Sequence, residues 1–84
     1  MRPQLKRGCL LILNAYAGTP MPELALLSAM RSHARQLDPT EADCREALRD
    51  CEAEGYAQGH TDDFDGSRSW TLTEKGIHKA RSLR

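Results

Sequence analysis

The chain has 84 residues, of which 39% are hydrophobic and 29% are charged, and its formal net charge at pH 7 is zero. This length and composition predict one small folded domain over residues 1–84 and exclude an intrinsically disordered chain. The longest apolar run, Cys9 to Leu13, is too short to cross a membrane, and the N-terminus carries no pattern of a secretion signal. We therefore expect a cytoplasmic protein with no membrane partner.

The residue types that most often build catalytic or metal sites are scattered along the chain. Cys9, Cys44 and Cys51 lack the spacing of metal ligands, as do the three histidines. Cys44 and Cys51 share one face of an expected helix about 10 Å apart, which is too far for a disulfide. No Ser/His/Asp or paired-carboxylate pattern is present either. We expect buried, reduced cysteines, no metal, no cofactor and no enzymatic activity.

The first expected helix is amphipathic with an unusually wide apolar surface. Residues at i, i+4, i+7, i+8 and i+11 form its apolar face: Leu5, Cys9, Ile12, Leu13 and Tyr16. Leu10 lies at the edge of this face and Leu11 well off it, which favours a helix covered on more than one side or a dimer interface. Gly18 and Pro20 are expected to end the helix.

A second helix is expected to begin at Pro22, with Glu23 in its first turn. Arg31 and Arg35 lie one turn apart on its outer side with Ser28, and Pro39 ends the segment because it disfavours helical backbone at Asp38. The inner face is formed by Leu26, Leu27, Met30 and Ala34.

The third helix has clear start and stop signals. Thr40 is its expected N-cap, with Asp43 three residues later as a weak capping box, and Gly55 is the expected residue after its C-terminus. Its buried face is expected to consist of Cys44, Ala47, Leu48 and Cys51.

A hairpin and a short helix complete the chain. Residues 56–62 and 67–73 are the expected strands, joined by a turn at residues 63–66. Trp70 is expected in the core, while Phe64 at the turn is a candidate contact residue. Thr73 is the expected N-cap of the last helix, whose inner residues are Ile77, Ala80 and Leu83. The resulting fold is mostly α with a small β-hairpin.

Two stretches of this sequence resemble the winged-helix superfamily. "ALRDCEAEGYA" resembles the end of a recognition helix that runs through a glycine into a wing strand, and "DGSRSWTLTEKG" resembles the wing and last helix of MarR-type and PadR-type bacterial regulators. The resemblance implies a winged helix-turn-helix (α-α-α-β-β-α) and a transcription regulator that binds duplex DNA. Its third helix would enter the major groove, and its wing would touch the backbone or minor groove.

The resemblance also implies a set of DNA-binding residues. The outer face of the third helix would contribute Ala42, Arg45, Glu46 and Arg49, with Ala53 beyond them. The wing would contribute residues 63–68, including Arg68, and Arg31 and Arg35 would flank the site from the second helix.

The charge distribution keeps a second hypothesis open. Residues 1–35 and 67–84 each carry a net charge of +4, whereas residues 36–66 carry −8. Acidic residues on the third helix and wing repel DNA, and Glu41 and Glu46 are placed to pair with Arg45 and Arg49. The alternative is an interaction module whose acidic helix and wing bind a basic protein surface. Blocks of opposite charge also suit self-association, for example as a homodimer in which the termini of one copy meet the centre of another.

Overall fold

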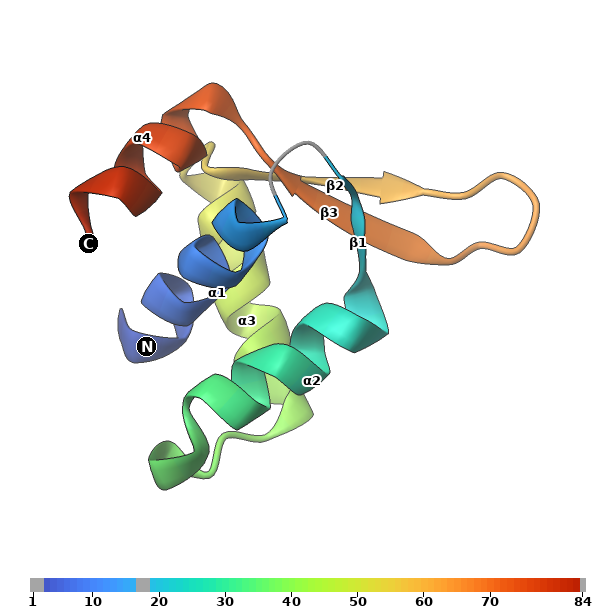
Figure 1. Cartoon of the computed structure of the whole chain (residues 1–84). Coiled ribbons are helices and arrows are strands. Elements are labelled where there is room, and N and C mark those ends of the chain that lie inside the picture. Colours follow the sequence, from blue (N-terminus) through green and yellow to red (C-terminus); the bar gives the residue numbers. More distant parts are fainter. Residues whose placement is uncertain (1–2, 17–18, 84) are drawn as a thin grey trace.

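The computed structural model describes residues 3–16 and 19–83 (Figure 1). Three helices form the body, a hairpin projects from it, and a fourth helix returns beside the first. The elements in chain order are α1 (Pro3–Ala15), β1 (Met21–Pro22), α2 (Glu23–His33), a 3₁₀ helix (Arg35–Leu37), α3 (Glu41–Ala53), β2 (Ala57–Thr61), β3 (Arg68–Leu72) and α4 (Glu74–Ser82). The expected mostly helical fold with a hairpin is confirmed.

The sheet has one more strand than the sequence indicated. β1 pairs antiparallel with β3, placing Met21 opposite Trp70 and Pro22 opposite Ser69, so that the strand order is β1-β3-β2. A two-residue strand is too short to show a periodic pattern. Pro22 is tolerated here because β1 is an edge strand, where a missing N–H costs little. The second helix therefore begins at Glu23, and the expected start at Pro22 is wrong.

The local signals of the third and fourth helices are confirmed atom by atom. Thr40 Oγ1 accepts a hydrogen bond from Asp43 N at 3.1 Å, and the Asp43 carboxylate accepts one from Thr40 N at 2.9 Å. This reciprocal capping box satisfies two backbone donors at the start of α3. Gly55 follows the helix with φ of +80°, a conformation that favours glycine. At the start of α4, Thr73 Oγ1 accepts from Gly76 N at 3.0 Å.

The core lies where α1 meets the other three helices and β3. Its members are Leu5, Cys9, Leu10, Leu13, Met21, Leu26, Leu27, Met30, Ala34, Cys44, Ala47, Leu48, Cys51, Ala57, Trp70 and Ala80. All three cysteines are completely buried as free thiols, as expected. A hydrogen bond with Cys51, together with burial, raises the pKa of the Cys9 thiol well above its ordinary value, so this thiol stays protonated at neutral pH.

Two expectations about the first two helices need correction. α1 ends at Ala15, so Tyr16 leaves the helix face and is 51% exposed. α2 ends at His33, so Arg35 belongs to the 3₁₀ helix rather than to α2, and Ala34 is buried between the two. Gly18, one of the residues expected to end the first helix, lies outside the described residues.

The backbone before Pro39 shows why the chain turns there. Asp38 adopts a left-handed conformation with φ of 46°, consistent with the expectation that Pro39 disfavours ordinary helical backbone at the preceding residue. No helix within residues 3–16 and 19–83 is long and apolar enough to cross a membrane.

Candidate nucleic-acid interface

The outer face of α3 is a solvent-exposed surface of mixed charge. Its inner residues are buried against the body, which leaves Ala42, Arg45, Glu46 and Arg49 exposed on the opposite side. This is the division that the helical period dictates once Cys44, Leu48 and Cys51 face inward. The structure thus brings the four sequence-predicted residues of this helix onto one accessible face.

Only one of the two expected ion pairs on this face forms. Arg45 Nη2 lies 2.7 Å from Glu41 Oε1, and both side chains are about half exposed. The expected pair between Glu46 and Arg49 is wrong, because Arg49 makes no ion pair with any residue in the described part of the chain. The exposed Arg45 pair is weak and exchangeable, and the Arg49 guanidinium is available to a ligand.

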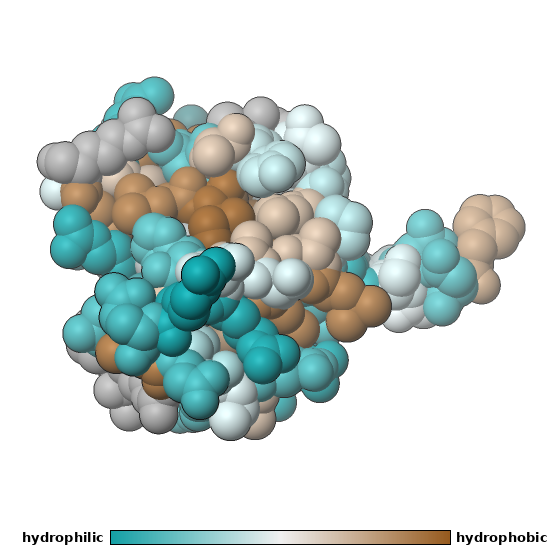
Figure 2. Space-filling model, turned by 60° about the horizontal axis from the view of Figure 1, so that its bottom comes forward, coloured by the Kyte–Doolittle hydropathy of each residue, from teal (hydrophilic) through white to brown (hydrophobic). Residues whose placement is uncertain are grey.

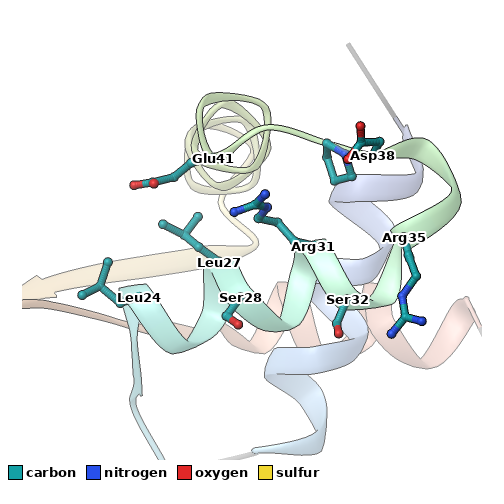
Figure 3. Close-up of a pocket in the computed structure, with 9 residues that line it drawn as sticks. Leu24, Leu27, Ser28, Arg31, Ser32, Arg35, Asp38 and Glu41 are labelled. Atoms are coloured by element: carbon teal, nitrogen blue, oxygen red, sulfur yellow. The ribbon is translucent and has the colours of Figure 1, made fainter.

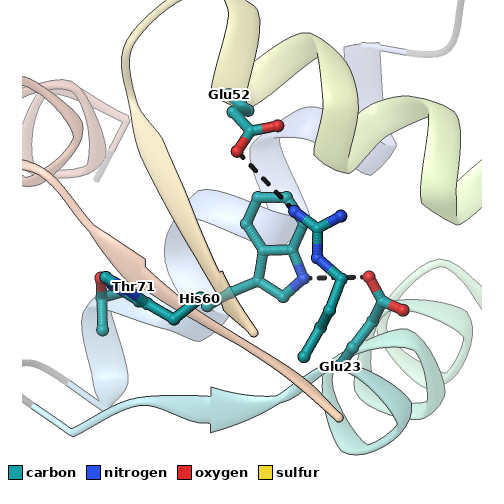
Figure 4. Close-up of polar contacts among 6 residues, drawn as sticks. Glu23, Glu52, His60 and Thr71 are labelled. Atoms are coloured by element: carbon teal, nitrogen blue, oxygen red, sulfur yellow. Dashed lines mark hydrogen bonds and ion pairs between the residues drawn. The ribbon is translucent and has the colours of Figure 1, made fainter. Parts of the chain in front are cut away.

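The base of the wing is held by a cluster of polar contacts around Trp70 (Figure 4). The indole N–H of buried Trp70 donates to Glu23 Oε1 at 3.1 Å, which ties β3 to the first turn of α2. The Arg68 guanidinium lies 5.1 Å from the centre of the Trp70 ring and 3.9 Å from Glu52 Oε2 on α3. These contacts direct Arg68 back toward α3 instead of out along the wing.

As a result, three predicted arginines share one concave surface. Arg45, Arg49 and Arg68 line a pocket of about 180 Å³ at the angle between α3 and the wing, with Leu48 and Trp70 behind them. Glu23 and Glu52 line the same pocket. The concentration of three guanidinium groups makes this concavity a candidate phosphate or base contact, and the two carboxylates reduce its positive potential.

The other two predicted arginines line a second concavity, between α2 and the start of α3 (Figure 3). Its volume is about 420 Å³, and Ser28, Ser32 and Glu41 also line it. Arg31 extends toward the start of α3, while Arg35 points to the other side of α2. Neither arginine makes an ion pair with the described residues. Glu41 borders this concavity and also pairs with Arg45. Its carboxylate therefore lies between the arginines of this concavity and those of the concavity beside the wing.

Three residues of this surface were missed by sequence reasoning. Glu23 and Glu52 act through contacts with β3, which lies far along the chain, so their spacing carried no signal. Leu24, which is 73% exposed, lines the concavity beside Arg31. A leucine directly after the expected helix start and outside the inner apolar face was a detectable sign of exposure.

Comparison with known proteins identifies the architecture. No protein-family model and no curated protein sequence matches the chain. Among solved structures, a mutant of MepR, a MarR-family protein from S. aureus, superposes with a TM-score of 0.77 at 18% identity over 94% of this chain. A candidate DNA-binding protein from Ralstonia eutropha superposes with a TM-score of 0.72 at 21% identity, covering 99% of this chain and 96% of that one. The chain has the winged-helix fold.

The winged-helix frame assigns a place to each element. α2 and α3 form the helix-turn-helix, and β2 and β3 form the wing. SSV1 F-93 is a further neighbour, with a TM-score of 0.67 at 19% identity over 92% of this chain and 80% of that one. The chain spans only 53% of the length of MepR.

No cluster of three potential metal ligands occurs within residues 3–16 and 19–83.

Proposed function

We propose that this protein is a small DNA-binding transcription regulator that inserts the outer face of α3 into the major groove of duplex DNA. The observation that carries the proposal is that Arg45, Arg49 and Arg68 line one concavity between α3 and the wing of a winged-helix fold. The neighbour described as a candidate DNA-binding protein, which matches nearly the whole chain, supports it. The proposal assigns the protein no enzymatic activity and a cytoplasmic location.

Each exposed residue of α3 has a chemistry that suits a base edge. Arginine donates two hydrogen bonds to guanine, so Arg45 and Arg49 are the proposed base-reading residues. Glu46 is suited to accept from the amino group of cytosine, and the Ala42 methyl group to contact that of thymine. Arg31, Arg35 and Arg68 are proposed to hold phosphates on either side of α3, which fixes the register of the helix in the groove.

The acids on this surface make the proposed binding selective. α3 carries five acidic residues against two arginines, so the phosphate backbone alone attracts it weakly. Arg45 must also leave Glu41 to contact a base, and this costs little free energy because the ion pair is exposed to solvent. Base contacts therefore have to supply an unusually large share of the affinity, and we expect a shallow dependence on salt concentration.

Mobility-shift measurements on a genomic duplex library at two salt concentrations test this proposal. Arg45→Ala and Arg49→Ala should each weaken specific binding by about 1–3 kcal/mol. Glu52→Lys should strengthen non-specific binding, because it removes a repulsive charge and adds a phosphate contact. Arg81→Ala is the matched control, since Arg81 is exposed on α4 away from both concavities. Failure of the wild-type protein to bind any duplex at physiological salt would contradict the proposal.

The second candidate function is a protein-interaction module. It is favoured by a specific feature of the wing tip, where Phe64 is fully exposed among Asp62, Asp63 and Asp65. On this proposal the wild-type protein gives no mobility shift, and partner binding is lost when Asp63, Asp65 or Glu46 is neutralised.

A further inference from the structure

The tip of the wing holds an aromatic side chain entirely in solvent. Phe64 is 101% exposed, whereas Trp70 at the base of the same hairpin is 2% exposed. The hairpin projects far from the body in Figure 1, and hydrophobic atoms lie at the far end of this projection in Figure 2. A large apolar side chain so placed does not contribute to the core.

The turn that carries Phe64 is well ordered by its own hydrogen bonds. Asp62 Oδ1 accepts from Phe64 N at 2.7 Å, Asp65 Oδ1 accepts from Ser67 N at 2.9 Å, and Asp62 N donates to Ser67 O at 2.7 Å. A side chain presented on an ordered turn loses little conformational entropy when it binds. Buried aromatic residues are also among the commonest energetic anchors of protein interfaces.

A complementary groove lies on the body of the same chain. Leu10 from α1, Tyr56 before β2 and Leu83 after α4 form the apolar part of a groove of about 330 Å³. The groove therefore offers an aromatic ring an apolar contact surface, here called the apolar seat, which consists of Leu10, Tyr56 and Leu83.

The charges around the groove are opposite to those around Phe64. Lys6, Arg7 and Lys79 also line it, and its one acid, Glu54, is paired with Lys6 at 2.6 Å. The turn carries three aspartates within four residues. The hydrogen bond from Ser67 lowers the pKa of the Asp65 carboxyl, so it remains ionised at neutral pH.

We propose that the wing tip of one copy docks into the α1–α4 groove of a second copy, with Phe64 in the apolar seat and the aspartates against the basic rim. The contact uses two different surfaces of each molecule, so it is heterologous and propagates head to tail. The wing tip and the two helices that line the groove, α1 and α4, lie on opposite sides of the molecule in Figure 1, which prevents a chain from filling its own groove. The proposal does not depend on DNA binding.

A second copy suits the wing tip better than DNA does. Phosphates repel the three aspartates, so neither the backbone nor the minor groove stabilises this turn. The chain itself carries the required combination of an apolar seat and a basic rim. The opposite net charges of residues 36–66 and of the two terminal segments further favour the association of copies.

Sedimentation velocity on the purified protein, without DNA, provides the first test. The weight-average mass of the wild type should rise with concentration up to about 1 mM, the range of weak protein contacts, without levelling at one closed oligomer. Phe64→Ser should raise the dissociation constant of the contact between copies about 30-fold or more, as expected for an anchor residue. Leu24→Ser is the matched control, because it alters another exposed apolar residue that belongs neither to the turn nor to the groove lining. It should leave the rise in mass with concentration unchanged.

Mixing two variants provides the decisive test. Phe64→Ser retains the groove, and Lys79→Glu retains the wing tip. Each variant alone should therefore show no rise in weight-average mass with concentration. Their equimolar mixture should form one additional contact and then stop, because each partner lacks the surface needed to continue. Circular dichroism spectra matching the wild type establish that both variants are folded.

Three results would overturn the proposal. The first is a wild-type mass that stays constant over the whole concentration range. The second is a rise in mass with concentration that persists in Phe64→Ser. The third is an equimolar mixture of the two variants whose weight-average mass equals the value expected for two proteins that do not associate. Suppression of wild-type growth by 0.5 M salt would support it, since the Debye length falls to about 4 Å and the rim charges are screened.

Discussion

The two ends of the wing differ in almost every physical property, although Phe64 and Trp70 are only six positions apart in the sequence. At the base, Trp70 is buried, its N–H is bonded to Glu23, and Arg68 covers its ring. At the tip, Phe64 is in water and its neighbours bond only within the turn. The base therefore belongs to the folding unit, while the tip is free to serve recognition, and substitutions at the two ends should affect different measurements.

The largest difference is expected between Trp70→Ala and Phe64→Ala. Removing the buried indole leaves a cavity and an unpaired Glu23, and should cost about 3–5 kcal/mol of unfolding free energy. This is a large fraction of the total for a domain of this size, which we expect to be about 4–12 kcal/mol. Phe64→Ala should change the unfolding free energy by less than about 0.5 kcal/mol. Urea denaturation monitored by circular dichroism measures both.

A conservative variant separates packing from hydrogen bonding at the base. Trp70→Phe keeps much of the buried apolar area but removes the N–H donated to Glu23. Its cost should lie between those of Trp70→Ala and Phe64→Ala. Equal costs for the two alanine variants would show that the base and the tip do not differ as described.

The sequence predicted the base of the wing largely through local patterns. The alternation around Trp70, the capping residues Thr40 and Thr73, and the glycine after α3 each require only neighbouring residues. β1 was missed because its two residues gain their structure only by pairing with β3, which lies about fifty residues away.

The candidate site was less predictable than the fold for the same reason. The helical period placed Arg45 and Arg49 on the exposed face of α3, but only the folded chain brings Arg68 into the same concavity. The winged-helix resemblance supplied the list of arginines to look for. It gave no information on Glu23 and Glu52, whose roles depend on tertiary contacts specific to this chain.

An intermediate effect is expected at Gly76, the glycine of "LTEKG", which lies beside the wing base. A Cβ at Gly76 would overlap the carbonyl oxygen of Tyr56, which also accepts from Thr73 N at 3.0 Å. Gly76→Ala should therefore cost about 1–3 kcal/mol by forcing α4 away from the start of β2. Gly66→Ala is the comparison at the tip, where a Cβ meets nothing within 4 Å and the only strain comes from φ of +73°. Thermal denaturation should show a lower Tm for Gly76→Ala than for Gly66→Ala, and the reverse order would contradict the close approach.

The smallest effect is expected from the charge of Asp65 at the tip. Its folded-state pKa lies below the ordinary value because the carboxylate accepts a hydrogen bond from Ser67 N. A depressed pKa stabilises the folded state above the unfolded-state pKa of about 3.9, and this contribution is lost as the pH falls through the folded-state pKa. Asp65→Asn keeps an acceptor oxygen and removes only the charge. Urea midpoints measured between pH 7 and pH 2 should therefore show a slightly less stable variant at neutral pH, with the difference disappearing at the acid end. A difference that did not shrink as the pH fell through the titration of this carboxyl would mean that the substitution alters the geometry of the turn, because protonation removes the contribution of the charge.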